Sequence, residues 1–407
     1  MSFYYWCEAT LCWLLSGLSL LLPLGRWLPE GNDAFGLFNR YCIRYTAQTR
    51  LMGEISYSIG FREVTETFFL EAAAEPVMFC SFIDGFLDGR LAYQAQELTF
   101  SPLDGGGGEY CIESVVLEWV KPPQDTRLLL EDAYSQAGVD LRRGGALDSF
   151  VWKAAPKGFA NLLNRFDEGR LVQQSYYGTG SPPYVSSNYM GTPWCYNPVQ
   201  GGDQHGNRSK LVHYATRGNE IYIKCRPMDW SKNSELTPSY MENTYTLKDG
   251  VLAVDNRFVD FSGYAHPASR QEMPACYVIS ALDTFYFYGG NAPWTDDALT
   301  RKSNLPFWGN NPDAFFYLDL ANTETWCIWT QGGQPDAFGL SVYTPGAEIL
   351  MAGRSGSKIT YDANADATNY VAPLRTLQMT AEPFEYTYYL TAGALSQVRG
   401  VWLGMQS

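Results

Sequence analysis

The chain has 407 residues, 46% of them hydrophobic, so it is long enough for two domains and can bury a substantial core, which excludes a largely disordered protein. Its net charge of −14, with no offsetting cluster of lysine or arginine, argues against binding to nucleic acid. Aromatic residues make up 15%, including 28 tyrosines and 12 tryptophans. Such rings suit half-buried strands and also stack on sugars, so a tyrosine-rich β-protein without a sugar ligand stays an alternative.

The first residues, 1–40, are interpreted as an apolar leader or first segment. The uncharged run from Ala9 to Leu24 is short for a membrane-spanning helix and suits the core of a signal sequence. However, Glu8 rather than a basic residue precedes it, and no small-residue cleavage pattern follows. Two interpretations therefore stay open. The protein is secreted or attached to a membrane through this leader, or it is cytoplasmic and the segment is a buried first helix or a misassigned start.

Residues 41–126 predict a small β-sandwich domain. Short segments rich in Val, Ile, Phe and Tyr alternate with turn residues, which is typical of successive antiparallel strands. The two prolines of 121–126 cannot continue a central strand and predict a linker. The strand candidates are 51–59, 64–72, 75–83, 92–100 and 111–120.

Residues 127–407 predict a large antiparallel domain of two sheets, which makes the whole chain all-β. Asp249-Gly250 between two β-rich arms predicts a hairpin tip. Long amphipathic segments are scarce, and no regular repeat supports a propeller. A two-sheet supersandwich fits this length better than a small immunoglobulin-like sandwich. The strand candidates are 211–216, 220–228, 243–261, 276–289, 314–320, 325–331 and 384–395.

The nine cysteines are widely spaced, form no CxxC pair and lie in strand-like segments, so we expect buried free thiols rather than a disulfide framework. The three histidines are dispersed. The segment from Asp362 to Asp366 imitates the start of a calcium loop, but Ala367 replaces the required glycine and Pro373 the required glutamate. A solvated loop is therefore the expectation, and we predict neither a metal nor a cofactor.

The first polar stretch that suggests a site begins at Asp167 and Arg170 and continues into the strand-like segment 171–177. Residues two apart on a strand share a face, and adjacent glutamines favour a polar cleft on at least one side. Alternatively, Asp167 and Arg170 form a structural ion pair at the start of the strand. The two predicted faces are Gln173, Ser175 and Tyr177 on one side, and Val172, Gln174 and Tyr176 on the other.

The second stretch is a loop over 192–209 that is rich in Gly, Pro and Asn. Loops on a rigid scaffold often carry binding groups, and this one combines aromatic with polar side chains, which predicts a sugar subsite. An ordinary surface loop is the alternative. Its candidate residues are Trp194, Asn197, Gln200, Asp203 and His205.

Two strand ends add further candidates. Arg226 and Trp230 lie around the end of one predicted strand, and Arg270, Gln271 and Glu272 directly precede another. Glu272 could face a cleft as a general acid or base, or it could simply pair with Arg270.

Several sequence blocks in a fixed order resemble a group of bacterial β-sandwich proteins similar to the galactose-mutarotase-like supersandwich. The resemblance covers roughly residues 130–405 and implies the handling of sugars, because aldose epimerases, glycosidase accessory domains and polysaccharide lyases share that sandwich. An epimerase fits least, since its paired histidines find no match here. The blocks are 138–153, 161–178, 193–209, 269–277, 338–346 and 370–374.

The favoured function is a glycoside hydrolase acting on an oligosaccharide or polysaccharide, with Glu272 as acid and Asp203 or Asp167 as the second carboxylate. The alternatives are a polysaccharide lyase for a uronate glycan, with Tyr176, Tyr177 or His205 as base, and a non-catalytic carbohydrate-binding protein. In the lyase, Arg170 and Arg226 would neutralise the uronate. The predicted substrate contacts are Arg170, Gln174, Tyr176, Trp194, Asn197, Gln200, His205, Arg226, Trp230, Arg270 and Gln271.

Overall fold

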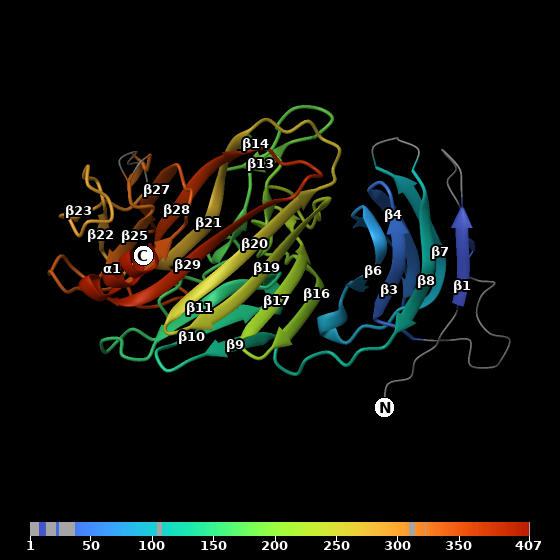
Figure 1. Ribbon diagram of the computed structural model, residues 1–407, viewed down its shortest axis with the longest axis horizontal. Helices are drawn as coiled ribbons and strands as arrows, with labels where there is room; N and C mark the ends of the chain where they lie inside the picture. Colours follow the sequence, from blue (N-terminus) through green and yellow to red (C-terminus); the bar gives the residue numbers. More distant parts are fainter. Residues whose placement is uncertain are drawn as a thin grey trace. The chain divides into compact units, whose positions relative to one another are not determined.

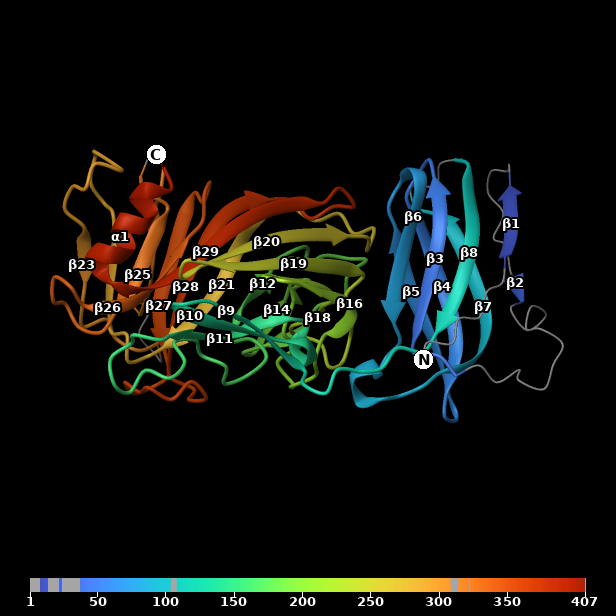
Figure 2. The ribbon, with the colours of Figure 1, turned by 60° about the horizontal axis from the view of Figure 1, so that its bottom comes forward.

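The computed structural model describes residues 8–13, 22–23, 37–103, 108–308, 314–321 and 323–406. The chain divides into two compact units, Met1–Asp125 and Thr126–Ser407. Each unit is built from antiparallel sheets, so the all-β prediction is confirmed. Figure 1 and Figure 2 show both units from two directions.

The first unit contains two four-stranded sheets. One has the order β1 (Glu8–Trp13), β8 (Tyr110–Glu118), β3 (Arg40–Ala47) and β6 (Ala73–Phe82). The other has the order β2 (Leu22–Pro23), β7 (Tyr93–Pro102), β4 (Leu51–Ile59) and β5 (Arg62–Leu70). Burial alternates along strand β4, where Leu51, Ile55 and Tyr57 are fully buried. A short 3-10 helix spans Phe86–Asp88.

The leader prediction falls largely outside the described residues. Of the run 9–24, the structure describes only the parts that belong to β1 and β2, and these pair with β8 and β7. Within the described part of the chain, no helix is both long and apolar enough to cross a membrane.

A disulfide joins Cys42 on β3 to Cys80 on β6, so the expectation of free thiols throughout is wrong here. The two cysteines are register partners on neighbouring strands, which brings their side chains together although 38 positions separate them in the sequence. Spacing alone could not reveal this pairing. In the second unit, Cys225, Cys276 and Cys327 are free and buried, as expected.

The second unit consists mainly of two large sheets, in which the neighbouring strands of Figure 1 run antiparallel. The first has the order β24 (Phe315–Asp319), β27 (Ile349–Ser355), β28 (Thr368–Leu377), β21 (Ser269–Ile279), β12 (Val172–Ser175), β11 (Ala146–Trp152), β10 (Ser135–Asp140) and β9 (Arg127–Glu131). It is completed by β15 (Pro198–Val199) beside β12 and β18 (Met228–Asp229) beside β15. A 3-10 helix, Leu141–Arg143, follows β10.

The second sheet has nine strands, in the order β16 (Lys210–Arg217), β17 (Glu220–Arg226), β19 (Ser239–Lys248), β20 (Val251–Asp260), β29 (Phe384–Ala394), β26 (Phe338–Tyr343), β25 (Trp326–Thr330), β22 (Thr284–Phe287) and β23 (Thr300–Lys302). The hairpin predicted at Asp249-Gly250 joins β19 to β20, and both residues have positive φ, 52° and 78°. A separate short hairpin pairs β13 (Ser187–Tyr189) with β14 (Thr192–Trp194).

The two large sheets face each other across an aromatic core. The Tyr176 ring, which follows β12, lies 4.6 Å from the Phe258 ring on β20 and 5.0 Å from the Phe384 ring on β29. These are edge-on contacts, the geometry that aromatic quadrupoles favour. The second unit is thus a sandwich of two large sheets.

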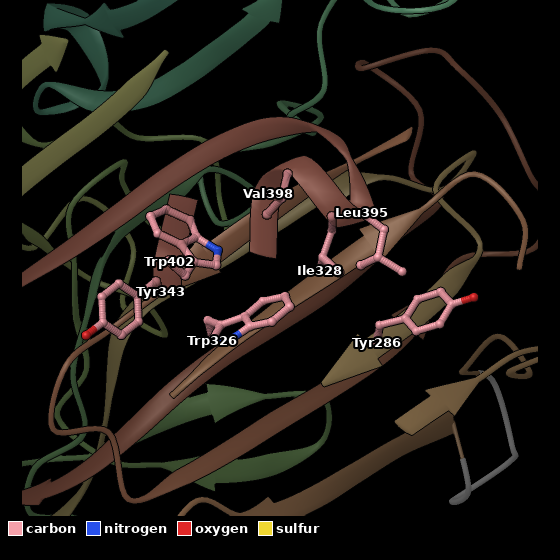
Figure 3. Close-up of a cluster of buried hydrophobic side chains, with 7 residues drawn as sticks. All are labelled: Tyr286, Trp326, Ile328, Tyr343, Leu395, Val398 and Trp402. Carbon is pink, nitrogen blue, oxygen red and sulfur yellow. The ribbon is translucent and has the colours of Figure 1, made fainter. Parts of the chain in front are cut away.

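The chain ends in a helix that the sequence analysis did not predict, α1 (Leu395–Gly404). Its apolar face covers strands β22, β25 and β26 of the nine-stranded sheet, as Figure 3 shows. Trp402 is 0% exposed, and burying such a side chain stabilises the fold by about 2 kcal/mol or more. The cluster comprises Tyr286, Trp326, Ile328, Tyr343, Leu395, Val398 and Trp402.

Candidate functional site

The candidate site is built around Glu272, on the face of the ten-stranded sheet that points away from the core. Strand β12 alternates as predicted: Gln174 and Tyr176 turn into the sandwich, whereas Ser175 and Tyr177 turn toward Glu272 on β21. Ser175 and Glu272 are register partners across the two strands. The outward face of β12 therefore carries the polar groups of the candidate site.

Glu272 is 4% exposed and is surrounded by hydroxyl groups rather than by a cation. The Tyr370 and Tyr177 hydroxyls both donate to its Oε1, the latter over 3.1 Å. Burial raises the pKa of this carboxyl, and hydrogen bonds from Tyr370, Ser175 and Tyr177 offset the rise only in part. The expected alternative, an ion pair with Arg270, does not occur in the described structure: tyrosine hydroxyls bind the Glu272 carboxyl, and Arg270 is exposed on the same strand.

Tyr277 links Glu272 to the Asp167 segment. Its ring lies 4.7 Å from the Tyr370 ring, because the two tyrosines are register partners on β21 and β28. Burial, followed by the charges of Glu272, Tyr189 and Asp167, raises the pKa of its hydroxyl. The charges of both carboxylates therefore act on the Tyr277 hydroxyl.

Asp167 lies in a tight turn at the edge of this site. Its Oδ1 accepts hydrogen bonds from the backbone amides of Gly169 (3.0 Å) and Arg170 (2.8 Å), and its Oδ2 lies 3.6 Å from Nε of Arg170. The expected ion pair is thus present. Arg170 also donates to the Asp366 carbonyl (2.8 Å) and lies over the Phe166 ring, so both side chains are held in place.

Four half-buried rings form what we term the aromatic patch: Tyr177, Tyr189, Trp194 and Trp230. The Tyr189 ring lies 4.9 Å from that of Trp194 and 5.7 Å from that of Trp230, and Trp194 lies 6.4 Å from Tyr177. The short hairpin β13–β14 supplies Tyr189 and Trp194. Trp194 and Trp230 were predicted. Tyr189 was missed, although Trp194 lies on the facing strand of the same hairpin and was a signal for it.

Asp203 does not join this site. Its Oδ1 accepts from the amides of His205 (2.8 Å) and Asn207 (2.9 Å), and its Oδ2 accepts from the Asn207 side chain (2.7 Å) and the Ser234 amide (2.8 Å). All four acceptor positions of the carboxylate are occupied, so it holds the loop together. His205 is exposed on the same loop.

Several predicted sugar contacts are internal hydrogen-bonding residues instead. Gln174 donates to the Glu242 carbonyl (2.8 Å) between the sheets, and Tyr176 donates to Gln174. Asn197 donates to the Tyr176 carbonyl (2.7 Å), and Gln200 to Asn243 (2.7 Å). Gln174, Tyr176 and Gln200 are buried where the two sheets pack on each other. Asn197 is also buried, but its Oδ1 accepts from the indole Nε1 of Trp194 (3.0 Å), so it holds one ring of the aromatic patch.

Three further residues that were predicted to bind the substrate lie elsewhere in the second unit. Gln271 is buried and bonds both the amide (2.7 Å) and the carbonyl (3.0 Å) of Tyr177, so it positions that residue. Arg226 donates to the Thr237 carbonyl (2.9 Å) and lies over the Phe261 ring. Arg270 lines a separate cleft described below.

The histidines do not form a pair. His266 is buried and accepts from the Thr179 amide (3.1 Å), His213 lies on β16, and His205 lies on the Asp203 loop. Among the described residues, no group of three or more His, Cys, Asp or Glu is placed to hold a metal ion. The Asp362 carboxylate accepts the Asn364 amide within its own loop.

No family model matches the chain, and no curated protein was found to be similar. Similar solved structures include a galactose mutarotase-like protein from Lactobacillus casei, 12% identical over 65% of this chain and 99% of that one, with a TM-score of 0.42. A galactose mutarotase related enzyme from Lactobacillus acidophilus is 11% identical over 65% and 97%, with a TM-score of 0.40.

An alpha-galactosidase from Lactobacillus brevis is 8% identical over 66% of this chain and 39% of that one, with a TM-score of 0.36. Proteins of the galactose mutarotase-like group, to which the sequence blocks point, are thus among the solved structures similar to this chain. At these TM-scores the similarity carries no conclusion about the site or its chemistry.

Proposed function

We propose that the protein is a carbohydrate-active enzyme that hydrolyses a glycosidic bond, with Glu272 as the general acid. The observation that carries this proposal is the environment of Glu272: a buried carboxyl with a raised pKa, hydrogen-bonded by hydroxyls, next to the aromatic patch. An acid catalyst must hold its proton at the working pH, and burial without a neighbouring cation favours the protonated form.

The aromatic patch supports the choice of a sugar as ligand. Tyr and Trp side chains are rigid and amphipathic, and they can pack against the apolar C–H face of a sugar ring while their polar ends reach its hydroxyls. Tyr189, Trp194 and Trp230 are half-buried, so they keep accessible surface and are also held in place by one another.

Asp167 is the best-supported second carboxylate. It lies at the edge of the patch: its charge acts on Tyr189, and Gly169, whose amide it accepts, closely approaches the Trp230 ring. Its Oδ2 faces the guanidinium of Arg170, which would balance the negative charge that a base or nucleophile carries. Glycoside hydrolysis uses such a pair, one carboxyl protonated and the other ionised.

The lyase alternative is disfavoured by the tyrosines themselves. A lyase base must lose its proton, yet burial and the charge of Glu272 raise the pKa of Tyr177, and burial raises that of Tyr176. His205, the remaining candidate base, is exposed on the Asp203 loop.

The test is digestion of a glycan library with product analysis, on wild type, Glu272→Gln and Asp167→Asn. We expect Glu272→Gln to bind glycan and to lose about 100-fold or more in turnover, as is usual for removal of a general acid. Glu131→Gln, which alters an exposed carboxylate on β9, is the matched control and should retain full activity.

Four results would contradict the proposal. Full turnover by Glu272→Gln would remove its catalytic role. Binding without any product from wild type would leave a carbohydrate-binding protein, and products with the ultraviolet absorbance of unsaturated uronates would indicate a lyase. If wild type neither binds nor alters any glycan, the carbohydrate function itself fails.

A further inference from the structure

The outward face that carries Glu272 continues across three more strands. Glu272 on β21 is the register partner of Leu374 on β28, Leu374 of Ile349 on β27, and Ile349 of Asp319 on β24. Register partners point to the same side of a sheet, so these residues form one row on the outward face. Three inter-strand spacings of about 4.8 Å make the row roughly 14 Å long.

A cleft of about 670 Å³ opens at the far end of this row. Arg270, which is two residues before Glu272 on β21 and therefore shares its face, lines the cleft together with Tyr317, Asp319, Glu348 and Ile349. The cleft and the Glu272 site thus lie along a single surface of the ten-stranded sheet.

The floor between the two sites is apolar, and its walls are polar. Tyr277, Phe315, Ile349 and Met351 are half-buried and pack on a buried cluster that includes Tyr370. Tyr317 lies on β24 and is 59% exposed, so its side chain is accessible to a ligand. Arg270, Asp319 and Glu348 supply exposed charged groups at the edge.

This combination is what a second sugar ring would require. An exposed aromatic ring offers a stacking surface, and nearby carboxylates and a guanidinium accept and donate hydrogen bonds to hydroxyls. A monosaccharide cannot span the row from Glu272 to Asp319, whereas an oligosaccharide can.

We infer that the cleft around Tyr317 is a remote subsite for the same glycan, so that the substrate is an extended oligosaccharide or polysaccharide chain rather than a single sugar. This inference rests on the proposed carbohydrate function. Tyr317 provides the stacking surface, Arg270 and Asp319 bind hydroxyls, and the half-buried apolar floor guides the chain toward Glu272.

The experiment measures binding and turnover on defined ladders, from disaccharide to octasaccharide, of β-1,4-linked gluco-, xylo- and manno-oligosaccharides and of α-1,4-linked galacturonates. For the ladder that wild type uses, kcat/KM should rise with chain length. Tyr317→Ala should lose that rise, with a drop of about tenfold on the longest members and no change on the shortest.

Two control variants separate stacking by the Tyr317 ring from other effects of the substitution. Tyr317→Phe should keep the length dependence, because the stacking face remains. Tyr134→Ala removes a comparably exposed tyrosine, 51% exposed, between β9 and β10 at the other end of the sheet, and should behave like wild type. Thermal unfolding of each variant checks that the fold is intact.

The inference is overturned if Tyr317→Ala keeps the wild-type length dependence, or if wild type binds and cleaves all lengths equally. A change in sedimentation on Tyr317→Ala, with length dependence unchanged, would assign the cleft to a second copy of the chain instead. If wild type acts on no ladder and binds none, it is the proposed function that fails, and this result is distinct from the outcomes above.

Discussion

Tyr177 donates a hydrogen bond to Oε1 of Glu272 over 3.1 Å, and Gln271, the residue before Glu272, positions Tyr177 for this contact. The Gln271 side chain bonds both backbone groups of Tyr177, so it anchors the end of β12 against β21. Strand β12 ends at Ser175, so the backbone groups of Tyr177 lie beyond its ladder with β21 and are satisfied by a side chain instead. Gln271 is therefore a positioning residue for the candidate acid.

The raised pKa of Glu272 predicts a specific dependence of stability on pH. Because the pKa is higher in the folded than in the unfolded state, the folded state binds the proton more strongly. This contribution is fully present below the unfolded-state pKa and is lost as pH rises through the folded-state pKa.

Measuring thermal unfolding midpoints of wild type and Glu272→Gln from about pH 4 to about pH 8 tests this sign. The wild type should lose stability relative to Glu272→Gln as pH rises. Catalysis should fall over the same window, since a general acid must be protonated. A constant difference in midpoint between the two proteins would contradict the assignment.

Removing one ring of the aromatic patch should weaken glycan binding more than it slows the chemical step. Trp194 contacts Tyr189 and presents a half-buried face, so Trp194→Ala should lower glycan affinity by about fivefold to tenfold, or about 1 kcal/mol. Calorimetric titration and steady-state kinetics would show KM raised and kcat nearly unchanged. Trp119→Ala, an exposed tryptophan of the first unit, is the control and should bind normally.

Asp203 should prove structural. Asp203→Ala leaves four hydrogen-bond donors of the loop without their acceptor, and we expect a loss of about 3 kcal/mol in the free energy of unfolding. Turnover per folded molecule should stay close to wild type, as judged by denaturant titration combined with activity at low temperature. Normal stability with abolished turnover would instead indicate that Asp203 is the second catalytic carboxylate.

The C-terminal helix should depend on a buried ion pair. Arg399 on α1 donates to Oε1 of Glu324 over 3.1 Å, and Glu324 also accepts from the Trp326 indole (2.6 Å) and the Trp294 amide (2.9 Å). Arg399→Met would leave this carboxylate buried and without its cation, which should cost about 3 to 5 kcal/mol.

Denaturant unfolding followed by tryptophan fluorescence measures this loss. Lys153→Met breaks an exposed pair with Glu131 and should cost only about 1 kcal/mol or less. Equal effects of the two substitutions would show that the Arg399 pair does not anchor the helix.

The local sequence was sufficient to predict the strands, their turns and their two faces, because these features depend on residues that are close together in the chain. Alternation of apolar residues predicted β4 with its observed bounds, 51–59, and the Asp249-Gly250 pair predicted the β19–β20 hairpin, because a turn of positive φ needs such residues. The alternation of 172–177 also separated Ser175 and Tyr177 correctly from Gln174 and Tyr176.

Only the tertiary structure decided which of those two faces is covered. A period of two defines two faces but does not say which one a second sheet will bury, so Gln174 and Tyr176 were expected in a cleft and lie in the core. Pairing between distant strands likewise brought Tyr277 and Tyr370 to Glu272 and joined Cys42 to Cys80. Such contacts depend on strand register over long separations, which no local pattern specifies. The sequence by itself thus determined the strands and their two faces, and the packing of sheet on sheet determined which polar residues could form a site.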